Sequence, residues 1–365
     1  MALQCGITGI ANVGKTTIFN CFSNTRGETT SYAFTSNRSN IGRISVPDHR
    51  LTELEKLHPT GKIVPVTFEI VDIPGLTRGA SLGEGVGNQF LSDIRNTDAL
   101  IHVLRCFDDD NLPHIDGTVD PVRDKETVEL ELQIKDLESV EKKIQKLEKV
   151  AKAGDKDAGK EVERLNRYKN HLEDCKSART IDLDDSEKKI VDDLFLLTAK
   201  PVLYVCNVDD ASAVSGNHYV EKVRESLSGE DAEILVIAGS LEADIAEFDD
   251  ADDRQEFLED VGLNEPGVNK LIRSAYTLLD LQTFFTMNPK EIHAWTLKRG
   301  MKAPQAAGTI HSDMERGFIR AEVMKYSDFV TYGSEQKCRE AGKLSVEGKQ
   351  YEVQDGDILY IRFNV

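Results

Sequence analysis

The chain has 365 residues, of which 39% are hydrophobic and 30% are charged, as is usual for a soluble protein of two or three domains. Its formal net charge of -19 argues against a general affinity for nucleic acid, and no apolar run is long enough to span a membrane. The first ten residues lack the basic region of a signal peptide, so we expect a cytoplasmic protein.

The first predicted elements enclose a glycine-rich loop. Residues 3–10 are expected to form a buried strand and residues 15–24 the start of a helix, while residues 9–16, GIANVGKT, fit the phosphate-binding pattern GxxxxGK followed by Ser or Thr. In such a loop, glycines let backbone N–H groups turn toward an anion, and the helix adds its positive N-terminal end. Lys15 is expected to neutralise the terminal phosphates during catalysis, and the Thr16 hydroxyl to bind Mg²⁺. The predicted nucleotide-binding residues here are Asn12, Val13, Gly14, Lys15, Thr16 and Thr17.

The next apolar run, residues 66–73, leads into DIPG at 72–75, a DxxG element. In switch-type nucleotidases, this aspartate holds Mg²⁺ through water and the glycine amide senses the γ-phosphate, so we assign these roles to Asp72 and Gly75. Leu76 follows, where many GTPases have a glutamine that orients water. Because leucine cannot polarise water, hydrolysis must recruit another group, an ion or a partner.

Two side chains are candidates for that group. His114 lies in the loop after the predicted strand 99–107 and could act as the catalytic group, although a solvated loop histidine is the alternative. Asn12 could help to ligate a monovalent cation such as K⁺ beside the phosphates, or its side chain could simply cap the loop.

The region 126–175 predicts an antiparallel helical hairpin. Apolar residues at 137, 140, 144, 147 and 151, and again at 162, 165, 168, 172 and 175, keep coiled-coil spacing on two segments joined by a basic, glycine-containing tip. Strands are then expected at 201–208 and 233–239. Apolar strands that alternate with helices indicate an α/β fold with a mostly parallel sheet covered on both faces.

NVDD at 207–210 stands where a guanine-reading NKxD motif would stand. Asp210 keeps the carboxylate that accepts from guanine, whereas Val208 removes the lysine stem that covers the base. Guanine selectivity is therefore weakened without being excluded. Together with the loop that follows the last strand, the predicted base-side residues are Asn207, Val208, Asp210, Ala238 and Gly239.

Charge and patterning change along the rest of the chain. Residues 242–265 hold eleven acidic residues against one arginine, which favours a solvated helix face. Residues 135–179 hold thirteen basic against ten acidic residues, and residues 280–365 hold twelve of each. Any contact with a polyanion would therefore fall on the hairpin or on the C-terminal region, where short alternating strands predict a small mixed α/β module.

Taken together, GIANVGKTT, VDIPGL with GASLGEGVGNQFL, the helical insert, NVDD, and the C-terminal APQAAGTIHSDMERGFIRAEVM and VQDGDILYIRFNV resemble the YchF family of Obg-like ATPases from end to end. The resemblance implies a P-loop domain of the translation-factor class, a coiled-coil insert, a C-terminal TGS module of β-grasp type, and a cytosolic ATPase that associates with ribosomes. It also implies that ATP is accepted as well as or better than GTP, and that a histidine matching His114 is present.

Three departures from the family pattern stand out. The first switch is YAFTSNRSN at 32–40, which assigns the magnesium-sensing hydroxyl to Ser36 by alignment, with Thr35 adjacent. Asp210 replaces the usual glutamate of NxxE. Because its side chain is shorter than that of glutamate, GTP again becomes a candidate substrate. Pro74 stands where the family usually has alanine.

We predict four ranges: a G domain at 1–118 and 196–279, a helical insert at 119–195, and a TGS domain at 280–365. The predicted function is a Mg²⁺-dependent nucleoside triphosphatase, with ATP favoured over GTP, that acts as a monomer on the large ribosomal subunit and contacts ribosomal RNA through the hairpin and the TGS domain. The alternatives are an RNA or ribosome interaction module that binds nucleotide but barely hydrolyses it, and a true GTPase because Asp210 is retained.

Overall fold

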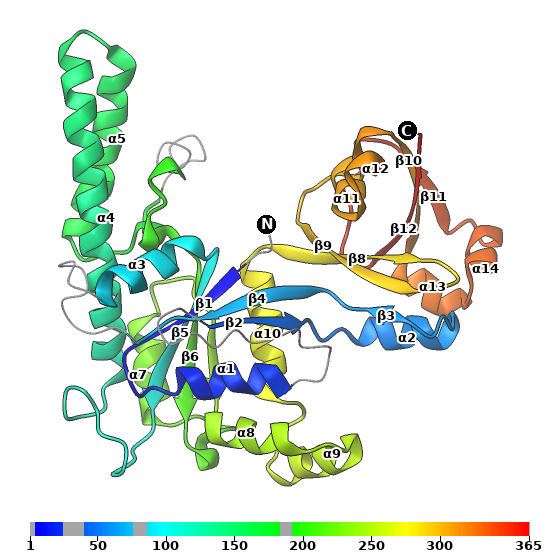
Figure 1. The fold of residues 1–365 in the computed structure, drawn as a ribbon, viewed down its shortest axis with the longest axis horizontal. Coiled ribbons are helices and arrows are strands. Elements are labelled where there is room, and N and C mark those ends of the chain that lie inside the picture. The colour runs from blue at the N-terminus through cyan, green and yellow to red at the C-terminus, as the bar shows by residue number, and fades with distance from the viewer. Residues whose placement is uncertain (1–3, 25–39, 76–85, 183–191, 365) are drawn as a thin grey trace. The chain divides into compact units, whose positions relative to one another are not determined.

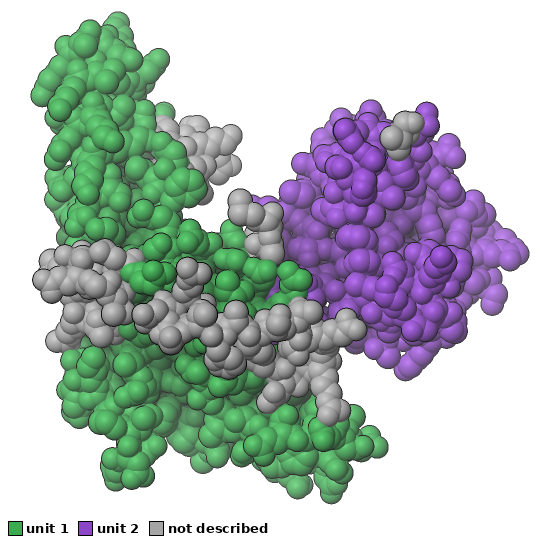
Figure 2. Space-filling model, viewed as in Figure 1, with its two compact units in different colours: residues 1–44, 69–271 green, residues 45–68, 272–365 purple. Residues whose placement is uncertain are grey.

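The computed structural model describes residues 4–24, 40–75, 86–182 and 192–364. Three positions discussed above lie outside these residues: Thr35 and Ser36 of the first switch, and Leu76 after DxxG. The chain divides into two compact units, one of residues 1–44 and 69–271 and one of residues 45–68 and 272–365 (Figure 2). No helix in the described ranges combines the length and the apolar character needed to cross a lipid bilayer.

The first unit is built on a six-stranded sheet (Figure 1). From one edge to the other its strands are β2 (Asn40–Ser45), β4 (Thr67–Asp72), β1 (Gln4–Thr8), β5 (Ala99–Cys106), β6 (Val202–Val208) and β7 (Ile234–Ile237). The pairs from β4 to β7 are all parallel. Every residue of β5 and β6 is buried, as expected for central strands covered on both faces. The predicted α/β fold with a mostly parallel sheet is confirmed.

The first unit also contains helices, some of which pack on this sheet. They are α1 (Lys15–Asn24), α3 (Val86–Asn96), α4 (Pro121–Lys152), α5 (Lys156–Glu173), α7 (His218–Ser226), α8 (Gly239–Glu247) and α9 (Ala251–Asp260), while α10 (Gly267–Leu278) begins in the first unit and ends in the second. Helix α1 packs against α8, and α4 packs against α7 and β5. The P-loop, residues 9–14, therefore lies at the carboxyl edge of the parallel strands, directly before α1, where ligands of open α/β sheets bind.

Helices α4 and α5 form the predicted hairpin and project from the sheet (Figure 1). Asp120 and Asp155 cap their N-termini by accepting backbone N–H groups, which satisfies donors that a helix start leaves free. The predicted apolar positions form the hairpin core, which includes Val140, Ile144, Leu165, Tyr168 and Leu172. One predicted position is wrong: Cys175 is exposed at φ 56, because α5 already ends at Glu173.

The base of the hairpin is fixed to the sheet unit by buried polar contacts. The Asp136 carboxylate of α4 accepts the backbone N–H groups of Leu197 and Thr198 at 2.7 Å, and Glu129 of α4 accepts from the hydroxyl of Tyr204 on β6. The hairpin therefore belongs to the first unit instead of forming a separate body.

The second unit holds another six-stranded sheet, of mixed direction. Its strands in order are β11 (Leu344–Glu347), β10 (Phe318–Lys325), β12 (Asp357–Phe363), β8 (Leu281–Met287), β9 (Ile292–Lys298) and β3 (Ile63–Val64). The helices are α2 (His49–Leu57), α11 (Ala303–Ile310), α12 (Ser312–Arg316), α13 (Tyr326–Tyr332) and α14 (Glu335–Glu340). Three alanines of α11 pack on Phe284 and Leu297, and these short side chains let the helix approach the sheet closely.

Residues 45–68 belong to this second unit, unlike the predicted domain range that placed them in the G domain. Strand β3 pairs in parallel with β9, matching Ile63 with Ile292. Arg50 of α2 donates to Asp48 and to Asp355 at 2.7 Å, and its guanidinium lies 5.1 Å from the centre of the Phe285 ring. These contacts attach a segment from the N-terminal part of the chain to the sheet of the C-terminal unit.

Candidate functional site

The P-loop backbone takes conformations that require glycine at two positions. Gly9 has φ 144 and Gly14 has φ 93, both in the region that side chains with a Cβ rarely adopt. A Cβ on Gly9 would lie 2.5 Å from the Val103 carbonyl oxygen, and one on Gly14 would lie 2.2 Å from Nδ2 of Asn207. Asn12 adopts φ 63, which asparagine tolerates better than most residues. The loop is thus shaped by close packing on β5 and β6.

Lys15 lies in the hollow of this loop. It is 8% exposed, and its Nζ donates to the Ile10 carbonyl at 2.5 Å. A Cβ added to Gly75 would lie 3.1 Å from this Nζ, so the DxxG glycine and the lysine are neighbours. Burial lowers the pKa of Lys15 to about 8, and the nearby Asp72 partly offsets this shift. An anion beside Nζ would stabilise the charged form that burial disfavours.

Thr16 and Asp72 also meet at this position. The Thr16 hydroxyl donates to Oδ2 of Asp72 at 3.2 Å. Burial raises the pKa of Asp72, while the bond from Thr16 and the charge of Lys15 oppose that rise. A hydroxyl beside a carboxylate is a donor set of hard oxygen atoms, which suits Mg²⁺. The two described residues of the predicted magnesium site are therefore together, and Ser36, the third, lies outside the described residues.

Asn207 joins the base-side motif to the P-loop. Its Nδ2 donates to the Val13 carbonyl at 2.9 Å, and its Oδ1 accepts the Gly239 N–H at 2.9 Å. Both ends of this buried amide are engaged by backbone groups, so Asn207 holds three nucleotide-site segments together. The motif alone predicted a residue that contacts nucleotide, and did not predict this positioning role.

The remaining base-side residues differ in exposure. Val208 is 2% exposed at the end of β6 and Ala238 is 3% exposed at the end of β7, so both side chains lie in the core of the sheet. Asp210 is exposed, and its carboxylate accepts from the hydroxyl of Ser240 on α8. The preceding Asp209 caps the 3₁₀ helix Asp210–Ser212 by accepting the Ser212 N–H at 3.1 Å. Both acidic side chains of NVDD are exposed, and Asp209 is the one that caps the helix.

The loop that carries His114 lies against the P-loop. The Asn12 side chain donates from Nδ2 to the Pro113 carbonyl at 3.2 Å, which fits the loop-capping alternative for Asn12. This bond spans 101 residues of sequence, and Pro113 directly precedes His114. The histidine is therefore carried on a segment that contacts the phosphate-binding loop.

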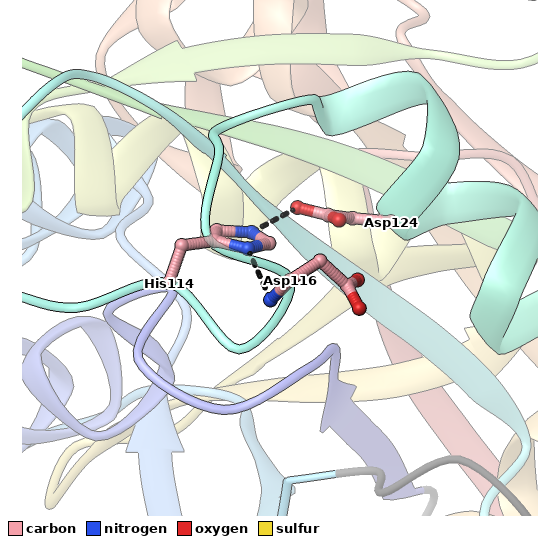
Figure 3. Close-up of side chains that lie close together, drawn as sticks. All are labelled: His114, Asp116 and Asp124. Atoms are coloured by element: carbon pink, nitrogen blue, oxygen red, sulfur yellow. Dashed lines mark hydrogen bonds and ion pairs between the residues drawn. The ribbon is translucent and has the colours of Figure 1, made fainter.

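His114 is buried, not solvated as the alternative from sequence supposed, because its side chain is 3% exposed. Figure 3 shows both ring nitrogens engaged: Nδ1 accepts the Asp116 N–H at 3.0 Å, and Nε2 lies 2.9 Å from Oδ2 of Asp124 on α4. Since Nδ1 is an acceptor, the proton is on Nε2, which donates to the carboxylate. Burial raises the pKa of Asp124, and the bond from His114 opposes that rise.

Oxygen and nitrogen atoms of His114, Asp116 and Asp124 lie within 4.8 Å of one another, a spacing that can hold a metal ion. In the present arrangement, however, the lone pair of Nδ1 is taken by a backbone N–H. The cluster is accordingly a hydrogen-bonded support for the histidine. Neither acidic partner was identified from sequence. The signal that could have found Asp124 is the Asp-Pro pair at 120–121, a typical helix start that places Asp124 in the first turn of α4.

Comparisons with known proteins cover both units. A family model described as "50S ribosome-binding GTPase" matches residues 4–152, and YchF-GTPase_C, described as "Protein of unknown function (DUF933)", matches residues 281–364. The Ribosome-binding ATPase YchF of Bacillus subtilis (strain 168) is 48% identical over 367 residues, which cover 100% of both chains. The chain belongs to the YchF family. Its YchF relative from Escherichia coli O157:H7 is 45% identical over 365 residues, again across 100% of both chains.

A solved structure supports the same assignment to the YchF family. The Schizosaccharomyces pombe YchF GTPase superposes with a TM-score of 0.88 at 34% sequence identity, covering 99% of this chain and 98% of that one. A GTP binding protein from Pyrococcus horikoshii OT3 has a TM-score of 0.58 at 19% identity and shares the fold. The family assignment predicted from the motifs is confirmed.

Proposed function

We propose that this YchF-family protein is a Mg²⁺-dependent nucleoside triphosphatase that hydrolyses ATP in preference to GTP and associates with the ribosome. The observation that carries the proposal is the convergence of Lys15, Thr16, Asp72 and Gly75 at one P-loop. Two relatives identical at 45–48% over the whole chain are named ribosome-binding ATPases, which supports both the activity and the partner.

In this proposal each residue has a distinct task. Lys15 neutralises the terminal phosphates, and the backbone N–H groups of the P-loop bind their oxygens. Thr16 and Asp72 would hold Mg²⁺, together with Ser36 or Thr35 of the first switch; when bound, the ion neutralises charge that develops on the phosphate oxygens. The Gly75 amide senses the γ-phosphate, and Asn207 keeps the base-side loops in register with the P-loop.

His114 has the role that the glutamine after DxxG has in many GTPases, because Leu76 stands at that position here. The bond between Asn12 and Pro113 brings its loop to the P-loop, and a histidine there can orient the attacking water. Because Nδ1 accepts from Asp116 and Nε2 donates to Asp124, one of these bonds must break before the ring contacts water. In this proposal, hydrolysis therefore requires a shift of the His114 side chain or of its loop.

The nucleotide preference rests on the base side. Asp210 is the exposed acceptor for guanine, but its carboxylate is already bonded by Ser240, and Val208 gives no stem to cover a base. Both features favour ATP over GTP. Asn12 could add a K⁺ dependence through Oδ1, since its Nδ2 is occupied by Pro113.

We also propose that the protein is a cytoplasmic monomer that contacts ribosomal RNA of the large subunit. The hairpin tip carries four exposed lysines, and the two ion pairs near it are loose, at 3.8 Å for Lys152 with Glu148 and 3.6 Å for Lys160 with Asp157. Exposed charges in weak pairs remain available to phosphates. A TGS module of β-grasp type in the C-terminal unit would supply the second contact. The tip lysines are Lys149, Lys152, Lys156 and Lys160.

A second candidate function follows from the two hydrogen bonds that engage both ring nitrogens of His114. If both ring bonds persist when nucleotide binds, the protein is a ribosome interaction module that binds nucleotide and barely hydrolyses it. Single-turnover hydrolysis of ATP and of GTP, with Mg²⁺ and with or without ribosomes, separates the two. The proposed function requires ATP hydrolysis that exceeds GTP hydrolysis and that ribosomes alter. Binding without measurable hydrolysis in either condition would favour the module, and faster GTP hydrolysis would identify a GTPase.

A further inference from the structure

Arg105, at the end of β5, is one of the largest fully buried side chains, with 2% exposure. Its three guanidinium nitrogens each donate to a backbone carbonyl: Nε to Phe107 at 3.1 Å, Nη1 to Leu112 at 2.8 Å and Nη2 to Asp109 at 3.3 Å. The guanidinium also lies 4.8 Å from the centre of the Phe107 ring. The buried guanidinium therefore lies inside the loop, and its N–H groups donate to the backbone carbonyl oxygens of the loop.

Such an arrangement fixes the loop tightly. A guanidinium is planar and presents its N–H groups in a rigid fork, so the three carbonyls must lie where the fork points. Opening the loop would leave a buried charge without partners, which is costly. Two bonds inside the loop add to this, since Leu112 N–H donates to the Asp109 carbonyl and Asn111 N–H donates to the Asp109 carboxylate.

The fixed loop leads directly to the catalytic segment. Leu112, whose carbonyl accepts from Nη1, is followed by Pro113, whose carbonyl accepts from Asn12 of the P-loop, and then by His114. In the sheet, Arg105 stands opposite Asn207, which binds the P-loop on its other side. On these paired strands, Arg105 holds the loop before His114, and Asn207 holds the P-loop.

We propose that Arg105 is a positioning residue for hydrolysis: it holds residues 107–112 so that Pro113 and His114 lie beside the P-loop. The inference rests on the role of His114 in the proposed function. Arg105 touches neither nucleotide nor water in this scheme and acts only through the loop. A purely structural arginine would instead change stability without changing the chemical step.

The test uses the full chain and two substitutions, Arg105→Lys and Arg105→Gln, each alone and combined with His114→Ala. Lysine keeps the charge, but its single ammonium nitrogen cannot donate to three carbonyls that are placed around a planar guanidinium. We expect Arg105→Lys to slow single-turnover ATP hydrolysis about 10–100-fold, part of the 10²–10⁴-fold worth of a positioned acid–base group. The affinity for ADP should stay within about threefold, and in the His114→Ala background the further loss should be under about twofold, since residues that act as a unit are not additive.

Arg179→Lys is the matched control, because Arg179 is also a largely buried arginine but donates to Glu129 and Glu230 at the base of the hairpin. Its hydrolysis rate should stay within about twofold of wild type.

Rates are normalised to the fraction of protein that binds ADP, so that unfolded protein does not lower the measured rate. If Arg105→Lys does not fold, Arg105→Gln takes its place. Faster amide hydrogen exchange at residues 107–114 in the folded variant should accompany the slower rate.

Three results would overturn the inference. These are a wild-type rate in folded Arg105→Lys, a full additional loss in the His114→Ala background, and a fall in ADP affinity as large as the fall in rate. The proposed function fails separately, when the wild-type protein does not hydrolyse ATP at all. If the wild type hydrolyses ATP and His114→Ala leaves its rate unchanged, then the role of His114 and the inference on Arg105 both fail.

Discussion

The nucleotide end of the sheet and the tip of the helical hairpin belong to the same unit but use polar groups in opposite ways. At the sheet end, Lys15, Asn207 and Arg105 are buried, and their donors go to backbone carbonyls. At the tip, Lys152 and Lys160 have side chains that are 80% and 70% exposed, and their ion pairs are 3.6 Å or longer.

This difference separates two kinds of function. A buried polar group interacts strongly because water does not screen it, and the surrounding bonds fix its position, as a site for chemistry requires. An exposed charge contributes little to folding and keeps its freedom to meet a large, mobile polyanion. Substitutions at the sheet end should therefore have large, specific effects, and substitutions at the tip small effects that depend on salt.

The largest effect on nucleotide affinity is expected from Lys15→Ala. Loss of the buried ammonium should weaken binding of ATP and GTP by about 100-fold or more, because the phosphate charge would be left unpaired. Isothermal titration with non-hydrolysable analogues measures this. Lys200→Ala is a suitable control, since Lys200 is also partly buried and donates to the carbonyls of Arg95 and Thr97. It should leave nucleotide affinity unchanged. Tight nucleotide binding by folded Lys15→Ala would contradict the phosphate role.

The second effect concerns His102, a buried histidine of β5 that is outside the site. Burial lowers its pKa from 6.5 to about 4, with Lys125, Arg179 and Lys15 adding to the shift and Glu129 opposing it. Its Nε2 has no hydrogen-bond partner among the described residues. Between pH 6.5 and 4 the unfolded chain binds a proton here that the folded chain does not, so stability must fall as pH falls through this window.

The size of this loss is roughly 3 kcal/mol, from 1.36 kcal/mol for each pKa unit. The variant His102→Leu lacks the titrating group, so the stability of the wild type relative to the variant should fall by that amount from pH 7 to pH 4. Urea denaturation of both proteins at pH 7, 5.5 and 4 gives the comparison. Parallel loss of stability in the two proteins would show that His102 is not buried in its neutral form.

A smaller effect is expected at Asp210, the exposed side chain of the base motif. Asp210→Ala should weaken GTP by about tenfold, because the carboxylate pairs with guanine donors that adenine lacks, and should change ATP much less. Asp209→Ala tests the neighbouring carboxylate that caps the 3₁₀ helix, and it should affect the two nucleotides alike. Competition titrations report both ratios. An equal loss of ATP and GTP in Asp210→Ala would rule out the assignment to guanine.

The smallest effect should come from the hairpin tip. Replacing its four lysines by glutamine should weaken ribosome association only several-fold at physiological salt, where exposed charges are screened. The log–log salt slope should fall by about 0.7–0.9 for each phosphate that a tip lysine neutralises in the wild type. Hydrolysis without ribosomes should not change. Co-sedimentation across a salt series provides the measurement, and an unchanged slope would assign the ribosome interaction to the C-terminal unit alone. The matched control replaces Lys222 and Lys270 by glutamine, because these exposed lysines belong to the first unit but lie outside the hairpin.

The same contrast explains what the sequence could predict. The P-loop, the buried strands and the hairpin were identified because each has a local pattern: glycines at fixed spacing, continuous apolar runs, or a coiled-coil repeat. The predicted runs 99–107 and 201–208 correspond closely to β5 (Ala99–Cys106) and β6 (Val202–Val208). In these segments, packing and local preference agree.

Features that depend on contacts distant in sequence were not predicted. Strand β3 has only two residues, too few for any periodicity, and Arg50 reaches a carboxylate 305 residues away. The bond from Asn207 to the P-loop spans 194 residues. Likewise, nothing in the loop sequence indicates that His114 is buried against Asp124, because that depends on where α4 begins in space. Such contacts decide whether a motif residue binds a ligand or supports its neighbours.

The most direct test of the account is single-turnover ATP hydrolysis by His114→Ala beside the wild type, with ADP affinity measured on the same samples. If His114 replaces the missing glutamine, hydrolysis should slow about 10²–10⁴-fold while ADP affinity stays within about twofold. An equal rate in the two proteins would contradict the account, and the buried histidine would then serve only to hold its loop to α4.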